Sequence, residues 1–110
     1  MIDQNNKASL ALMCKSHNYQ LDAINPAQDE YRVGNWVIAD RRRKDLLGAS
    51  VVLTESQRSP AYMGGTIIGF NPLQNGKCEV LFREDKSLVG NTDAVDHSGW
   101  GSGRGVCYVR

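Results

Sequence analysis

From residue 66 to residue 82 the chain reads Thr66-Ile67-Ile68-Gly69-Phe70-Asn71-Pro72-Leu73-Gln74-Asn75-Gly76-Lys77-Cys78-Glu79-Val80-Leu81-Phe82. Two runs rich in β-branched and aromatic residues flank Asn75-Gly76. Such a pair between two such runs is the strongest short signal of a β-hairpin, because both turn residues accept positive φ. Gly69 lies inside the first run, where glycine usually marks a bulge or a tight corner. The stretch predicts antiparallel strands at residues 66–70 and 78–82.

Similar short runs lie on both sides of this hairpin. Residues 36–39 follow Gly34-Asn35, residues 50–54 follow Gly48, and residues 106–109 end the chain. Residues 8–15 suit a helix by composition and a strand by the spacing of their leucines, and we choose a strand. Residues 26–30 predict one short helical turn. The fold class expected is mainly β, a single curved sheet or small barrel of five to six short strands with at most one or two short helices.

Length and composition limit the domain organisation and the electrostatics. The 110 residues are enough for one domain, residues 1–110, with a loose lead-in over residues 1–7. The apolar fraction of 41% predicts a folded core, and 13 basic against 12 acidic residues give a net charge of only +1. Any electrostatic function must therefore be local. Since no signal peptide or membrane-spanning run is recognisable, we expect a cytoplasmic protein without a membrane partner.

Cysteine and histidine give no sign of a metal or a disulfide framework. Cys14, Cys78 and Cys107 are odd in number and lack any Cys-x-x-Cys spacing, so we expect three reduced, buried thiols. His17 and His97 do not match a compact zinc signature. No metal and no cofactor is expected.

Cations and aromatic residues supply the candidate binding residues. Arg41, Arg42, Arg43 and Lys44 are adjacent and are expected in a loop between two strands, where they either contact phosphates or form a solvated turn beside Asp40 and Asp45. A second loop, residues 56–65, carries Arg58 and Tyr62. The pair either stacks a flat ligand, or Tyr62 packs over the edge of the core.

Glycines crowd into residues 99–105, a loop that also carries Trp100 and Arg104. A dinucleotide-binding loop needs a helix after it, and only five residues follow Gly105, so that interpretation is excluded. Two alternatives remain open. The loop presents Trp100 and Arg104 to a ligand, or Trp100 covers the end of the core.

One short segment combines acids with an imidazole. Asp93, Asp96 and His97 are candidates for an acid–base site in a small hydrolase-like enzyme, with His97 as acid or base and an aspartate orienting it. The alternative is an ordinary loop with an Asx turn. Neighbours in sequence are rarely oriented for a proton relay, so the enzyme hypothesis ranks last.

Residues 31–39 read Tyr31-Arg32-Val33-Gly34-Asn35-Trp36-Val37-Ile38-Ala39, and short strands with glycine corners follow up to residue 82. This stretch resembles the entry to the barrel of PUA-like modules, which include the ASCH and EVE domains. The resemblance implies a small β-barrel that binds RNA or a modified base. The Gly-x-Lys-x-x-Glu-x-Arg pattern of ASCH domains is absent, so the resemblance contributes no site residue.

The leading hypothesis is a small binding module for nucleic acid or another anionic, aromatic ligand. Its candidate binding residues are Arg41, Arg42, Arg43, Lys44, Arg58, Tyr62, Trp100 and Arg104. The alternative is a homo-oligomeric assembly protein, such as a homodimer that pairs its sheet edges. If the candidate residues converge on one cavity, the binding hypothesis gains support.

Overall fold

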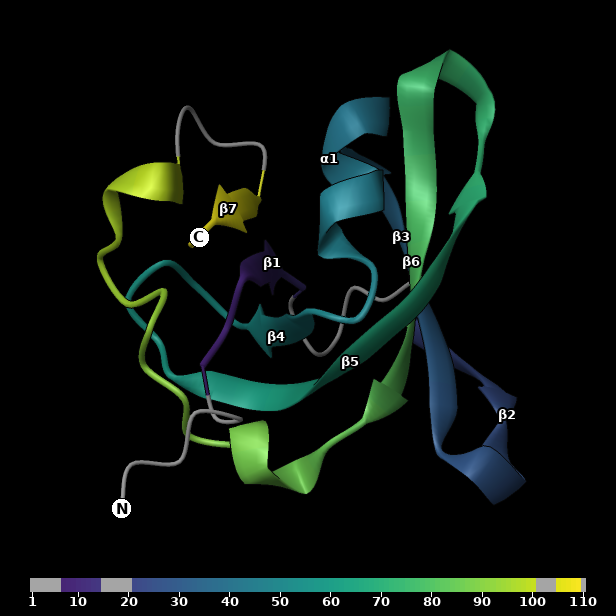
Figure 1. The fold of residues 1–110 in the computed structure, drawn as a ribbon. Coiled ribbons are helices and arrows are strands. Elements are labelled where there is room, and N and C mark those ends of the chain that lie inside the picture. Colours follow the sequence, from purple (N-terminus) through teal and green to yellow (C-terminus); the bar gives the residue numbers. More distant parts are fainter. Residues whose placement is uncertain (1–6, 15–20, 101–104, 110) are drawn as a thin grey trace.

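The computed structural model describes residues 7–14, 21–100 and 105–109. Within these residues seven strands form one mixed sheet in the order β2-β3-β6-β5-β4-β1-β7, and a single α-helix lies beside the β5–β6 hairpin (Figure 1). The strands are β1 (Leu10–Met13), β2 (Leu21–Asn25), β3 (Glu30–Val37), β4 (Ser50–Thr54), β5 (Ala61–Pro72), β6 (Lys77–Glu84) and β7 (Val106–Tyr108). The helix is α1 (Asp40–Leu46), and the 3-10 turns are η2 (Pro26–Gln28), η3 (Gln74–Gly76), η4 (Lys86–Leu88) and η5 (Ser98–Trp100).

The mainly β class is confirmed, and the expected strand count is wrong. Seven strands replace the expected five to six, and the sheet is not closed into a barrel. The strand missing from the expectation is β2, which has no buried residue and therefore lacks the apolar alternation that identifies a half-buried strand. The expected strands in residues 8–15 and 106–109 are confirmed as β1 and β7, and the short helical turn as η2.

The hairpin turn forms as the sequence predicts. Asn75 and Gly76 have φ values of 63° and 74°, and the Lys77 N–H donates to the Gln74 carbonyl. Paired positive φ values are the requirement of the turn type that matches the natural twist of two antiparallel strands. Both strands extend beyond the expected bounds, and β5 begins at Ala61. Tyr62 therefore lies in a strand, and the expected loop over residues 56–65 is corrected.

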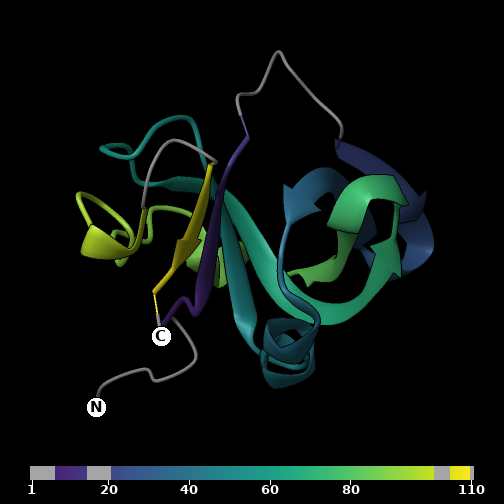
Figure 2. The ribbon, with the colours of Figure 1, turned by 90° about the horizontal axis from the view of Figure 1, so that it is seen from above.

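Strand β5 joins the two halves of the sheet and bends between them (Figure 2). Its first half pairs with β4, and its second half pairs with β6. A Cβ atom on Gly65 would lie 2.1 Å from the Arg83 carbonyl oxygen, so only glycine permits this approach of β5 to β6. The register shifts between Ile67 and Gly69. The bulge expected at Gly69 is thus present, and it increases the local twist.

Residues 41–44, expected in a loop, lie in the helix α1. The segment contains no glycine or proline, the residues with the lowest helix propensity. Its charges also favour a helix, because Asp40 lies in the first turn and Arg43 and Lys44 lie in the last, where they interact favourably with the helix dipole. Leu46 is its only buried residue. A short helix with one buried residue leaves almost no periodic signal in the sequence, which is why the expectation failed.

Both faces of the β1–β4 pair are covered. These strands are parallel; Leu10, Leu12, Val51 and Leu53 belong to the main core, whereas Ala11 and Val52 belong to a second core. The second core also contains Leu88 and Trp100, from the segment that crosses the outer face. Burial on both faces is typical of parallel strands.

Candidate functional site

Trp100 and Tyr62, the two aromatic residues expected to stack a ligand, pack against the hydrophobic cores. Trp100 is 3% exposed, and its Nε1 donates to the Ala94 carbonyl at 2.7 Å. Tyr62 packs against the main core, and its hydroxyl donates to the Cys14 carbonyl. Burial is the main reason that the pKa of the Tyr62 phenol is raised. Of the two alternatives for Trp100, covering the core is the one that the structure shows.

The described candidate cations lie in two parts of the chain, four in α1 and Arg58 in the connection between β4 and β5. The Arg58 side chain is 88% exposed, and its Nε lies 3.6 Å from the Asp96 carboxylate. Arg104 lies outside the described residues. Arg42 lies 4.2 Å from the centre of the Tyr108 ring, a cation–π contact between α1 and β7. Trp100 is buried, so it does not offer its ring to a ligand beside Arg58 or Arg42.

Arg43 secures the first turn of α1. Its Nε donates to the Ile38 carbonyl at 3.0 Å, and its Nη1 lies 3.0 Å from the Asp40 carboxylate. Burial raises the pKa of the Cys78 thiol, and the positive charge of the nearby Arg43 partly lowers it again. The charge of Arg43 is thus largely satisfied within the protein. Lys44 and Arg41 form no ion pair with a described residue.

A groove lies between α1 and β5, and two of the candidate residues line it. We call it the α1–β5 groove; its volume is about 550 Å³, and its lining residues are Asp40, Arg43, Lys44, Leu47, Ile68, Gly69, Phe70 and Pro72. Leu47 and Ile68 are 53% and 38% exposed, so both offer apolar surface to the groove. The groove therefore combines apolar walls with the ammonium group of Lys44.

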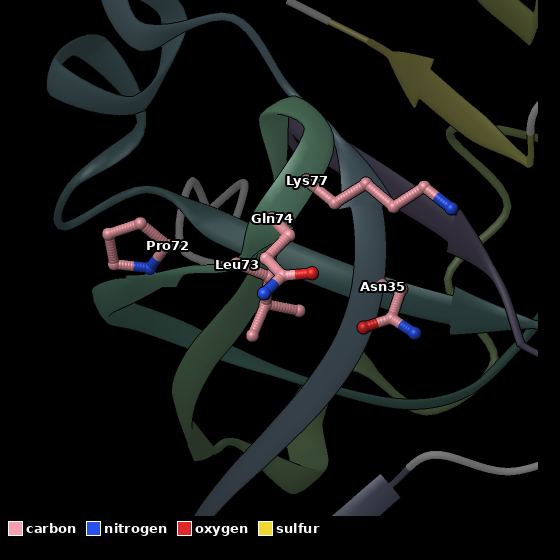
Figure 3. A pocket seen from close by; sticks show the side chains of 5 residues that line it. All are labelled: Asn35, Pro72, Leu73, Gln74 and Lys77. Carbon is pink, nitrogen blue, oxygen red and sulfur yellow. The ribbon is translucent and has the colours of Figure 1, made fainter.

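A second cavity lies at the turn of the same hairpin, and we call it the hairpin pocket. Its volume is about 580 Å³, and its lining residues are Asn35, Pro72, Leu73, Gln74 and Lys77. Figure 3 shows Leu73 and Gln74 between Pro72 on one side and Asn35 on the other, with the Lys77 side chain extending above them toward the side of Asn35. Pro72 lines both cavities. The groove and the pocket are thus neighbours around one hairpin.

A bulge in β3 places Asn35 at this pocket. The strand runs through Gly34 and Asn35, which corrects the expectation that it begins after them. The register shifts between Val33 and Trp36, so Asn35 is released from regular pairing and is exposed while its neighbour Trp36 is buried. Bulges commonly redirect a side chain in this way next to a functional site.

The geometry around His97 does not match an acid–base site. Its Nδ1 accepts from the Gly99 N–H at 2.8 Å and lies 3.6 Å from the Cys107 sulfur. Asp93 accepts from the Ala8 N–H at 2.9 Å, and Asp96 faces Arg58. Cys107 is fully buried, and burial raises its pKa. The aspartates thus anchor strands and loops, and the thiol nearest to His97 is a buried, neutral group.

Among residues 7–14, 21–100 and 105–109, no three His, Cys, Asp or Glu side chains gather in a way that holds a metal ion. All three cysteines are free and buried, as the sequence predicts. No helix of the described residues has the length and apolar character needed to cross a membrane.

Comparisons of the chain with models of protein families, with curated proteins and with solved structures find no match.

The sequence reasoning missed most residues that line these cavities. The missed residues are Asn35, Leu47, Ile68, Phe70, Pro72, Leu73, Gln74 and Lys77. One signal was present: Leu46-Leu47 follows a run of charged residues, and a short helix that packs on one side can bury only one of two adjacent leucines. The exposure of Leu47 follows from the burial of Leu46.

Proposed function

We propose that this protein is a small binding module that holds an anionic ligand with a flat, apolar part in the α1–β5 groove. The observation that carries the proposal is the pairing of apolar walls, Leu47, Ile68 and Phe70, with the ammonium of Lys44. Binding sites for small ligands are mostly apolar, with a few polar groups that fix orientation, and have volumes of roughly 300–1,000 Å³. The groove, at about 550 Å³, falls within that range.

The charge balance of the groove favours an anion. Asp40 and Arg43 pair with each other at 3.0 Å and nearly cancel. Lys44 lines the groove without an ion pair to a described residue, so it supplies the uncompensated charge. An anion placed there gains a charge-assisted hydrogen bond, while its apolar part covers Leu47 and Ile68.

A small ligand is favoured over nucleic acid. Binding of single-stranded nucleic acid relies on exposed aromatic side chains that stack bases beside a cationic track. Trp100 is buried in the second core, and the Tyr62 hydroxyl donates a hydrogen bond to the Cys14 carbonyl. Two of the three arginines of α1, Arg43 and Arg42, are engaged with Asp40 and Tyr108.

The direct test uses 8-anilinonaphthalene-1-sulfonate, an anion with a flat apolar body, and follows its fluorescence as it binds the folded protein. We expect saturable binding that Lys44→Gln weakens about three- to tenfold, equivalent to roughly 0.7–1.4 kcal/mol, and that Ile68→Asp abolishes. Matched controls are Lys86→Gln and Val89→Asp, which change an exposed lysine and an exposed apolar residue outside the groove.

Two results would count against the proposal. One is equal loss of binding in the control variants, which would indicate general surface binding. The other is tight, salt-sensitive binding of an oligouridylate that Lys44→Gln does not weaken, which would point to nucleic acid held elsewhere.

A second candidate function is self-association through the edge of the sheet. Strand β2 stands at one end of the strand order, and four of its five residues are exposed. An open edge offers unpaired backbone groups to a second copy of the chain. Sedimentation velocity at high concentration tests this: a species of twice 12.2 kDa supports it, and a monomer throughout removes it.

A further inference from the structure

The hairpin pocket has a chemistry different from that of the α1–β5 groove. Asn35 and Gln74 each offer an amide, with an N–H₂ donor and a carbonyl acceptor, and Lys77 offers an ammonium group. Leu73, which is 38% exposed, and Pro72 form the apolar wall. The pocket therefore presents a partner for an amide, a partner for an anion and a partner for an apolar side chain.

Glu79, the first acidic residue after Lys77 in β6, contacts Asn71 and Arg32. Glu79 lies two residues after Lys77, and its Oε1 accepts from the Asn71 side-chain amide at 2.7 Å. Its Oε2 lies 4.0 Å from Arg32. Lys77 forms no ion pair with a described residue, so its charge is available to an anion at the pocket.

The hairpin holds these groups in a fixed relation. The Leu73 N–H donates to the Lys77 carbonyl at 2.8 Å, which ties together the two residues that flank the turn. Asn35 stands opposite them because of the β3 bulge (Figure 3). Asn35, Pro72 and Lys77 come from strands, and Leu73 and Gln74 come from the short turn between β5 and β6. A site built mostly on strands and a tight turn is better ordered than one built on a long loop.

We propose that the hairpin pocket binds the C-terminal residue of a peptide. That residue carries the three groups that the pocket matches: a carboxylate for Lys77, an amide for Asn35 and Gln74, and an apolar side chain for Leu73 and Pro72. The inference rests on the proposed function, because the preceding residues of the same peptide pass Pro72 and enter the α1–β5 groove. There an aromatic side chain meets Phe70 and Ile68, and an acidic one meets Lys44.

The chemistry separates this ligand from other anions. A fatty acid offers a carboxylate and an apolar chain, and it leaves the amides of Asn35 and Gln74 without a partner. A phosphate offers neither an amide nor an apolar part. Since an unmatched polar group at a binding site lowers affinity, the complete set of three contacts favours a peptide end.

The experiment compares acetyl-Glu-Phe-Leu with a free carboxylate and the same peptide with a C-terminal amide, by calorimetric titration. We expect the amidated peptide to bind wild type about tenfold more weakly, as expected for a lost charge-assisted hydrogen bond. In Lys77→Gln the two peptides bind equally, and at the level of the amidated one. Lys86→Gln, the matched control, keeps the tenfold preference.

Failure of this inference is distinguishable from failure of the proposed function. If wild type binds both peptides equally, or Lys77→Gln keeps the preference, the pocket does not recognise a terminal carboxylate, while weakening by Lys44→Gln still supports the groove. If octanoate binds as tightly as the free peptide, the carboxylate alone is recognised and the peptide assignment is overturned. If neither peptide binds and Lys44→Gln leaves naphthalene sulfonate binding unchanged, the proposed function fails as well.

Discussion

Among the glycines that the structure describes, Gly65 is the position with the least room for a side chain. A Cβ atom there would lie 2.1 Å from the Arg83 carbonyl oxygen, which is backbone and cannot move aside without separating β5 from β6. We expect Gly65→Ala to lower the free energy of unfolding by about 3 kcal/mol, measured by urea denaturation. Gly69→Ala is the control, because its nearest atom, Cδ1 of Leu81, lies at an ordinary 3.5 Å.

For Gly69→Ala the change in unfolding free energy should stay within roughly 0.5 kcal/mol. Equal losses in the two variants would show that strand propensity, rather than the approach of β5 to β6, determines the need for glycine.

The buried thiols make stability depend on alkaline pH. Burial raises the pKa of Cys14, Cys78 and Cys107 above the ordinary value of 9.0. The unfolded chain therefore loses these protons before the folded one, and the free energy of unfolding falls as the pH rises through and above about 9. We expect the urea midpoint to decrease between about pH 7.5 and about pH 10.

The variant with all three cysteines replaced by alanine isolates this effect. Its midpoint should decrease less steeply over the same interval, whatever its stability at neutral pH. Parallel slopes in the two proteins would contradict the assignment of the alkaline loss to the thiols.

At the scale of the element, α1 is a short helix with an incomplete N-terminus. Ala39 occupies the N-cap position with extended dihedral angles and makes no side-chain cap. A serine there would accept a hydrogen bond from one of the free N–H groups of the first turn. We expect Ala39→Ser to raise the free energy of unfolding by about 1 kcal/mol, measured by urea denaturation.

Ala39→Val serves as the control, because valine provides no acceptor and should give no gain. A serine variant no more stable than the valine variant would mean that contacts with Arg43 and Tyr108, rather than capping, limit the stability of α1.

The elements differ in how far the sequence could predict them. The β5–β6 hairpin was predictable because Asn75-Gly76 encodes its own turn. By contrast, β2 and α1 each bury at most one residue fully, so neither leaves an apolar pattern. α1 is stabilised by the cation–π contact of Arg42 with Tyr108 and by the hydrogen bond from Arg43 to the Ile38 carbonyl. The sequence pattern does not indicate that these residues lie close together.

At the scale of the whole molecule, a mainly β fold was predictable and its open sheet was not. The candidate site was likewise predictable only in part. Arg43 and Lys44 were identified from their charge, and the apolar walls formed by Leu47, Ile68 and Phe70 become visible only when α1 lies beside β5. Trp100 was a candidate because it shares a glycine-rich stretch of sequence with Arg104, whereas here it fills the second core.

The central claim is that ligand binds in the α1–β5 groove and reaches the hairpin pocket. The most direct measurement is a ¹⁵N–¹H correlation spectrum recorded while acetyl-Glu-Phe-Leu is added. We predict saturable amide shifts at residues 44–47, 68–70 and 73–77 and at Asn35, with residues around Arg58 and His97 unchanged. Shifts centred on Arg58 and His97, or no saturable shifts in the groove, would contradict it.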